Sequence, residues 1–143
     1  MRMDQQMRDS QREPNGDLVL RTLAMPSDTN PNGDIFGGWI MSQMDIGGGI
    51  LAKEIAAGRV VTVAVDGMTF HRPVKVGDVV CCYGKCIRIG NTSIAVKLEI
   101  WVKSVLSDPL NDRFCVTEAL FTYVAIDQRG KPRTIERTKE NRV

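Results

Sequence analysis

One carboxylate in this sequence stands among residues that usually fill a protein interior. Asp45 lies in the segment 36–57, where apolar residues recur with helical spacing, and Met41 and Gly49 lie one turn away on either side. An acid on the inner face of a core helix is costly unless it has a partner or a task. Such a carboxylate can act as a general base. The alternative is an acid that is solvated or bonded to a buried backbone group.

A glycine pair precedes this acid along the same predicted helix. Gly37 and Gly38 fall at the helix N-terminus, where unpaired N–H groups and the positive end of the helix dipole gather. Without side chains they would let a ligand oxygen approach the backbone, which predicts an oxyanion site. The alternative is that Asp34 caps the helix and the glycines only relieve packing. A candidate base eight residues after Gly37 favours the functional interpretation.

A second group of residues has chemistry suited to phosphate. A turn at 90–93 supplies hydroxyls and N–H groups, and two arginines add positive charge. The members of this group are Arg72, Arg88, Asn91, Thr92 and Ser93. Most hairpins with such residues are only hairpins, so both interpretations stay open. In the loop before the helix, Asn30 and Asn32 could orient a substrate or a water molecule.

Several other chemistries find little support. The only histidine, His71, lies at a predicted strand end, and no G-x-S-x-G elbow is present to supply a serine nucleophile. No P-loop or G-x-G-x-x-G motif occurs. With one histidine and four cysteines that lack CxxC spacing, we expect no metal site. We expect the cysteines to be reduced, as is typical of the cytoplasm.

The elements that position these residues follow from periodicity and turn signals. We expect strands at 18–25, 61–70, 79–89, 92–102 and 113–126, with the helix at 36–57. One helix cannot cover both faces of such a sheet, so the simplest layout is an α+β fold with a curved antiparallel sheet around the helix. Open sheet edges predict a homo-oligomer, with dimerisation through an edge. Trp101 should face outward beside Lys97 and Glu99 and mark a subunit contact.

Length and charge set the remaining limits. The 143 residues suit one domain, which we place at 18–135 between a disordered segment, 1–17, and a polar tail, 136–143. A net charge of +2 without a basic run argues against nucleic acid as a partner. No apolar segment approaches 18 residues and the N-terminus is polar, so we expect neither a membrane span nor a signal peptide.

Four stretches carry a resemblance to a known family. These are LAMPSDTNPNGDIFGGWIMSQMD, VVTVAVDGMTFHRPVKVGDVV, the GNTS turn and ALFTYVAID. They resemble the hotdog-fold acyl-CoA thioesterases of the YciA type, which are related to the animal cytosolic acyl-CoA hydrolases. The resemblance covers about residues 18–135 and implies a five-stranded antiparallel sheet wrapped around one long central helix. It also implies dimers with active sites at the interface, often assembled as homohexamers from three dimers.

The resemblance also assigns roles. It implies that Asp45 is the catalytic carboxylate, that Asn30 is the loop amide, and that Gly37, with Gly38 beside it, supplies the oxyanion N–H. It loosely implies coenzyme A contacts from Arg72 and the Thr92–Ser93 turn. Five glycines in the helix are costly, and we expect 47–49 to thin it so that the sheet and the substrate come close.

The function expected from the resemblance is hydrolysis of acyl-CoA to a carboxylic acid and coenzyme A. Broad tolerance of short to medium acyl chains is expected, and no cofactor beyond the coenzyme A of the substrate. Asp45 would either activate water or attack to form a mixed anhydride. One alternative is a hydroxyacyl dehydratase, for which His71 lies in the wrong place. The other is a non-catalytic acyl-CoA sensor, although 17 N-terminal residues are too few for a DNA-binding module.

Overall fold

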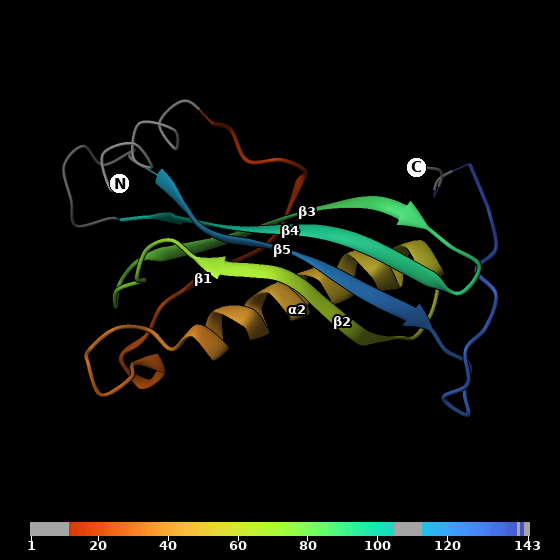
Figure 1. The fold of residues 1–143 in the computed structure, drawn as a ribbon, viewed down its shortest axis with the longest axis horizontal. Coiled ribbons are helices and arrows are strands. Elements are labelled where there is room, and N and C mark those ends of the chain that lie inside the picture. Colours follow the sequence, from red (N-terminus) through yellow and green to blue (C-terminus); the bar gives the residue numbers. More distant parts are fainter. Residues whose placement is uncertain (1–11, 105–112, 140, 142–143) are drawn as a thin grey trace.

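The molecule combines one long helix with one antiparallel sheet. A computed structural model describes residues 12–104, 113–139 and 141. The five strands lie in the order β1-β3-β4-β5-β2, and α2 runs along one face of the sheet (Figure 1). The elements are β1 (Asp17–Leu23), a 3-10 turn (Pro26–Asp28), α2 (Gly37–Ala56), β2 (Val60–Phe70), β3 (Val79–Ile89), β4 (Ser93–Lys103) and β5 (Arg113–Ala125). The predicted α+β layout is confirmed.

The helix ends within one residue of the predicted bounds. Phe36 is the N-cap, with an extended backbone and no side-chain cap bond. At the other end Ala57 has a left-handed backbone with φ of 53°, and Gly58 donates its N–H to the carbonyl of Lys53. This closes the final turn in the manner common to helix C-termini. Three residues, 57–59, therefore separate the helix from the start of β2.

The core lies between α2 and the inner face of the sheet. Strand β4 supplies its centre, where alternate residues point at the helix and are fully buried. These residues are Ile94, Val96, Leu98, Ile100 and Val102. The alternation predicted for this strand is confirmed. From the helix, Ile40, Met44 and Ala52 complete the contact.

Two of the three central helix glycines are required by close packing. A Cβ on Gly48 would lie 2.4 Å from the hydroxyl oxygen of Tyr123, and one on Gly47 would lie 2.9 Å from a methyl of Val19. Real Cβ atoms do not approach other atoms so closely. At Gly49 the nearest atom would be 3.9 Å away, which is ordinary contact. The predicted thinning of the helix therefore holds for Gly47 and Gly48 but not for Gly49.

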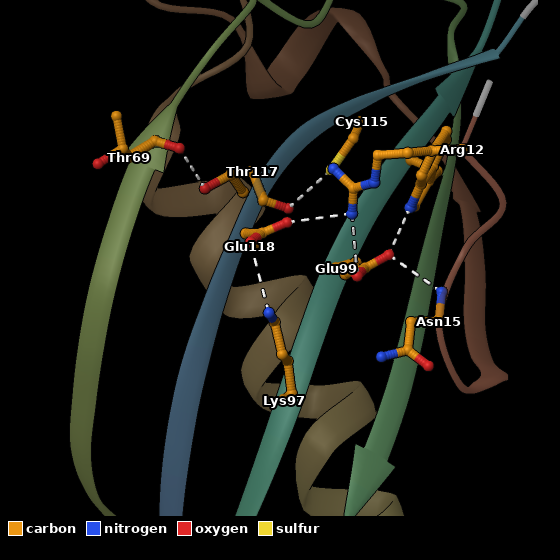
Figure 2. A network of polar contacts seen from close by, with 9 residues as sticks. Arg12, Asn15, Thr69, Lys97, Glu99, Cys115, Thr117 and Glu118 are labelled. Atoms are coloured by element: carbon orange, nitrogen blue, oxygen red, sulfur yellow. Dashed lines mark hydrogen bonds and ion pairs between the residues drawn. The ribbon is translucent and has the colours of Figure 1, made fainter. Parts of the chain in front are cut away.

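The segment before β1 lies on the outer face of the sheet, away from α2. The Glu99 carboxylate, only 2% exposed, accepts hydrogen bonds from the Asn15 N–H at 3.1 Å, the Trp101 indole N–H at 2.8 Å and the Arg12 guanidinium at 3.2 Å (Figure 2). Of the predicted disordered segment 1–17, residues 1–11 lie outside the described residues. Its remainder contacts the sheet, and Asp17 already belongs to β1, so disorder is wrong there.

Trp101 is on the predicted face but is not available to a partner subunit. Its side chain is 1% exposed, and the guanidinium groups of Arg12 and Arg113 lie 5.5 and 5.9 Å from its ring centroid. Both distances are within the range of a cation–π contact. Alternation along a strand indicates which face a residue occupies but not what crosses that face. The predicted subunit contact through Trp101 is therefore replaced by contacts within the chain.

The described part of the C-terminal tail packs against the helix end. Asn141 is 7% exposed and donates its side-chain amide to the carbonyls of Glu136 and Ile55. Arg137 donates to the carbonyl of Ile89. These bonds tie the tail to both α2 and β3, so this polar segment is held by polar contacts rather than by burial of apolar groups.

A few global properties complete the description. No helix in the described part of the chain is long and apolar enough to cross a membrane. The same residues contain no group of three or more potential ligands placed to hold a metal ion. The four cysteines form no disulfide. Burial raises the pKa of Cys82 to about 12, so this thiol stays protonated.

Candidate functional site

Asp45 is held by hydroxyl groups from two strands. Its Oδ1 accepts a hydrogen bond from the Thr62 hydroxyl at 2.5 Å and another from the Tyr123 phenol at 3.2 Å. Among the residues that the structure describes, none donates to Oδ2. The side chain is half-buried, so the expected apolar interior is only partly correct. One carboxylate oxygen is therefore fixed, and the other has no hydrogen-bond donor within the described part of the chain.

Asp45 lines a hollow of about 400 Å³ between α2 and the start of β2, together with Thr62 and Tyr123. Ile46, Gly49 and Ile50 line its helix side, and Val60 lies opposite. Two cations also line it, Lys53 on α2 and Arg59 just before β2. Lys53 lies eight residues beyond Asp45, about 12 Å at 1.5 Å per residue. The hollow therefore combines an apolar wall, one acid and distant positive charge.

The helix N-terminus has backbone N–H groups that bond to none of the residues that the structure describes. The N–H groups of Trp39 and Ile40 bond to the carbonyl of Phe36. Gly37 and Gly38 are left among the first-turn N–H groups that have no partner within a helix. A Cβ on Gly38 would meet nothing within 4 Å, while one on Gly37 would touch the Phe70 ring at 3.4 Å. The backbone at Gly38 is thus open to a ligand atom.

The alternative in which Asp34 caps the helix is wrong. Asp34 instead forms an ion pair with Lys75, which fixes the loop before the helix. The same loop is shaped by Asn30, whose side-chain carbonyl accepts the N–H groups of Asn32 at 2.9 Å and Asp34 at 3.1 Å. The Asn30 carbonyl is therefore occupied. Its amide nitrogen donates to none of the described residues.

Within one chain these candidates do not meet. Gly37 and Asp45 lie on one helix at a distance of about 12 Å, from the rise of 1.5 Å per residue. That exceeds the reach of groups that act on a single thioester, which must lie about 3 Å from the reacting atoms. Asn30 does not line the hollow beside Asp45. The chain therefore contains the predicted parts but does not by itself assemble them.

The residues predicted to bind phosphate divide between two ends of the sheet. Arg72 stacks over the ring of Phe114, 4.3 Å from its centroid, beside the start of β5. The 90–93 turn lies at the opposite end, because Ser93 pairs with Val124. The residues at this second end are Arg88, Asn91, Thr92 and Ser93. Phosphate binding by these residues stays a prediction, and one chain does not bring all five together.

Two polar neighbours of Asp45 were not predicted. Thr62 and Tyr123 are direct partners across the β2–β5 pair, so their side chains lie on one face of the sheet. Thr62 lies within the stretch VVTVAV, and Tyr123 follows Thr122 in the stretch ALFTYVAI. The sequence shows both hydroxyls, but connecting the two residues requires the strand register. Lys53 and Arg59, the two cations that line the hollow, were also not predicted.

Large apolar side chains are exposed around the hollow and along the open edge of the sheet. Strand β2 has a partner on one side only, and Val63 at its middle is 54% exposed. The others are Phe36, Met41, Ile46, Ile50, Val61, Val65 and Phe70. Exposed apolar groups gathered on neighbouring elements usually mark an interaction surface. An unpaired strand is likewise a site for another strand.

Comparison with known proteins gives consistent results. The model of the Thioesterase superfamily matches residues 32–106. The acyl-CoA thioester hydrolase YciA of Escherichia coli (strain K12) is 70% identical over 122 residues, which cover 85% of this chain and 92% of that protein. The crystal structure of HI0827, a hexameric broad specificity acyl-coenzyme A thioesterase, has a TM-score of 0.85 at 66% identity and covers 90% of this chain and 86% of its own. The hexameric thioesterase y2039 from Yersinia pestis has a TM-score of 0.83 at 66% identity, covering 88% and 100%.

One helix surrounded by a five-stranded antiparallel sheet in this order is the hotdog fold. The acid at the middle of that helix lines a hollow beside the edge strand β2. By sequence and by structure the chain belongs to the thioesterase superfamily. The resemblance noted in the sequence is therefore confirmed.

Proposed function

We propose that this protein hydrolyses acyl-CoA thioesters to a free carboxylic acid and coenzyme A. The observation that carries the proposal is the placement of Asp45, which is fixed through Oδ1 and lines a hollow of about 400 Å³. The names of the relatives support the substrate class. By analogy with HI0827, we expect broad specificity, with short to medium acyl chains preferred. Water is the only co-substrate, so the reaction needs no cofactor.

Oδ2 of Asp45 serves one of two chemical routes. As a general base it takes a proton from water while the water oxygen bonds to the thioester carbon. As a nucleophile it attacks that carbon itself and forms a mixed anhydride, which water then cleaves. In both routes the C–S bond breaks and coenzyme A leaves as a thiolate that takes up a proton. A single turnover in water labelled with oxygen-18 separates them, because the anhydride route can leave label in Asp45.

The oxyanion donors are proposed to come from a second subunit. The exposed edge β2 and its valines provide a surface for pairing two sheets about a twofold axis. Two α2 helices related by this axis run antiparallel. The axis therefore passes level with the residue halfway between any two residues that lie opposite each other. If Gly37 of the partner subunit lies level with Asp45, the axis passes level with Met41, which is 38% exposed. Asn30 would come from the partner together with Gly37 and Gly38.

Assembly beyond the dimer and the location in the cell are proposed by analogy. HI0827 and y2039 are described as hexameric, and we propose a homohexamer built from three dimers. Reduced cysteines fit a cytoplasmic protein. We propose that Arg72, Arg88 and the turn Asn91–Ser93 bind the coenzyme A nucleotide from different subunits, because one chain holds them at opposite ends of β5.

The decisive experiment replaces Asp45 by asparagine and follows thiol release from acetyl-, butyryl- and hexanoyl-CoA. We expect a loss of kcat by a factor on the order of 100 to 10,000, the usual contribution of such a group. Glu54→Gln, at an exposed position of the same helix, is the control and should keep wild-type activity. Near-wild-type turnover by a folded Asp45→Asn variant would contradict the catalytic role of Asp45. Binding without turnover by the wild type would instead indicate a sensor.

The dehydratase alternative receives no structural support. His71 is exposed, and its backbone N–H bonds to Val116. Its side chain does not line the hollow beside Asp45.

A further inference from the structure

A tyrosine lies directly beneath the candidate catalytic acid. Tyr123 belongs to β5, and its side chain is 1% exposed. Its phenol oxygen lies 3.2 Å from Oδ1 of Asp45 and 3.2 Å from the backbone carbonyl of the same residue. A single O–H thus contacts both the side chain and the main chain of one helical residue. This contact connects the sheet to the middle of α2 at the point where the proposed chemistry occurs.

The phenol is a permanent donor rather than a proton acceptor. Burial raises the pKa of Tyr123 above its ordinary value, and the negative charge and hydrogen bond of Asp45 raise it further. The hydroxyl therefore keeps its proton throughout the pH range in which a thioester is assayed. Tyr123 is 1% exposed and borders the hollow beside Asp45. Within the described part of the chain its phenol hydrogen-bonds only to Asp45, so its effect on the reaction is expected to pass through that residue.

The helix is built to admit this contact. A Cβ at position 48 would lie 2.4 Å from the phenol oxygen and 2.6 Å from a methyl of Leu98. Glycine within a helix is less favourable than alanine, so the sequence accepts a local loss of stability here. The methyl of Leu98 ends a flexible side chain and can shift. The phenol oxygen cannot shift without breaking its hydrogen bonds to Asp45.

We propose that Tyr123 is a positioning residue for Asp45, that it holds Oδ1 so that Oδ2 faces the hollow, and that position 48 is glycine to leave the phenol this place. The proposal rests on the proposed thioesterase function. Thr62 holds the same oxygen from the neighbouring strand at 2.5 Å. With both hydroxyls present the carboxylate is fixed from two directions, and with one removed it can rotate about the other. Active sites depend on such preorganisation.

The first test is Tyr123→Phe, which removes only the hydroxyl. We expect kcat to fall on the order of tenfold or more, because small misplacements of a catalytic group are costly, and KM to change less than about twofold. The acid limb of the pH–rate profile should move to higher pH, since the ionised carboxylate loses a donor. Tyr83→Phe is the matched control. It alters the chain's other tyrosine, on the outer face of β3, and should change neither kcat nor the pH–rate profile.

The pH readout is specific because the surrounding charges do not change. The charged groups lining the hollow with Asp45 are Lys53 and Arg59, and Cys82 is the other titratable group near the phenol. All three are retained in Tyr123→Phe. A purely structural role of the hydroxyl would lower the amount of folded enzyme without moving the acid limb. An unchanged acid limb and an unchanged kcat together overturn the proposal.

The second test uses Gly48→Ala alone and combined with Tyr123→Phe. Alone, the added methyl should displace the phenol and lower kcat about as much as Tyr123→Phe does. In the double variant the hydroxyl is already absent, so the methyl should cost little more. Independent sites would give additive losses, and additivity here contradicts the proposal. If Tyr123→Phe does not fold, a wild-type kcat in Gly48→Ala contradicts it instead.

The two proposals fail in different ways. If Asp45→Asn is inactive while Tyr123→Phe keeps the wild-type kcat and pH profile, the positioning role is wrong and the proposed function stands. If Asp45→Asn keeps wild-type turnover, the catalytic role of Asp45 is wrong, and any loss in Tyr123→Phe must have another origin.

Discussion

Replacing Arg12 by methionine is expected to destabilise the fold by about 2 kcal/mol. Methionine preserves an apolar stem over the Trp101 ring and removes the charge that faces Glu99. The Glu99 carboxylate is 2% exposed and would keep only its bonds to the Asn15 N–H and the Trp101 indole. No other cation pairs with Glu99 among the residues that the structure describes. The buried negative charge would therefore lose its counter-charge.

The magnitude follows from the burial of the two partners. Removing one member of a fully buried ion pair costs about 3–5 kcal/mol, and a hydrogen bond to a charged group contributes about 1.5–3 kcal/mol. The Arg12 side chain is 38% exposed, so the lower part of these ranges applies. Its second bond, to the partly exposed Glu118, adds about 0–1 kcal/mol. For a chain of this size 2 kcal/mol lowers the melting temperature by roughly 4–8 °C.

Urea unfolding at one fixed protein concentration is the assay, because the stability of an oligomer depends on concentration. Arg129→Met, at an exposed position, controls for the loss of an arginine and should change the free energy of unfolding by less than about 0.5 kcal/mol. The sharper test is the pair with Glu99→Gln. Without a charge at position 99, Arg12→Met should cost about 1 kcal/mol or less. An equal cost of Arg12→Met in both backgrounds would refute the reasoning.

Three further predictions concern the proposed axis, an outer-face acid and the helix glycines. Met41→Cys should cross-link two subunits on mild oxidation, because the proposed axis passes level with this residue, whereas Ile50→Cys should not. Non-reducing electrophoresis compares the two variants, and equal cross-linking would contradict the proposed axis. Burial would raise the pKa of Glu118, but Lys97 and Arg12 lower it below its ordinary value. Its stabilising contribution is therefore complete above the ordinary value of about 4.3 and is lost as the pH falls below it. Glu118→Gln should flatten the melting temperature between about pH 5 and pH 3, and an unaltered slope would argue against these ion pairs. At position 49 an added Cβ meets only an atom 3.9 Å away, so Gly49→Ala should stabilise the helix by up to about 1 kcal/mol. Gly48→Leu should instead destabilise the core by about 1–3 kcal/mol or prevent folding. Urea unfolding measures both variants, and a change of the same sign in both would disprove the packing account.

The fold could be predicted because its signals are local. The helix spans 37–56 where 36–57 was expected, and β3 has the predicted bounds, 79–89. Alternation within each strand also identified the buried face of β4. The sequence does not show that β2 lies at an edge next to β5. That pairing includes register shifts after Thr62 and after Asp66, which no periodicity reveals.

The candidate site could be proposed from the sequence only where a single residue carried the signal. Asp45 was visible as an acid on a helix, and Gly37 and Gly38 as a pair at its start. Tyr123 could not be connected with Asp45, because its role depends on the β2–β5 register and on the space left by Gly48. Trp101 shows the opposite failure. Its face was predicted correctly, yet a segment expected to be disordered covers it.

The spacing that first suggested a site in the sequence is also the reason that one chain cannot form it. An acid and a pair of free N–H groups eight residues apart on a rigid helix stay about 12 Å from each other whatever the sheet does. A twofold axis between two such helices removes the conflict, since each helix then supplies its acid to one site and its N-terminus to the other. The same axis would cover the exposed valines of β2 and close the hollow beside Asp45. A single symmetric contact thus accounts for the unpaired edge, the exposed apolar groups and the separated catalytic parts.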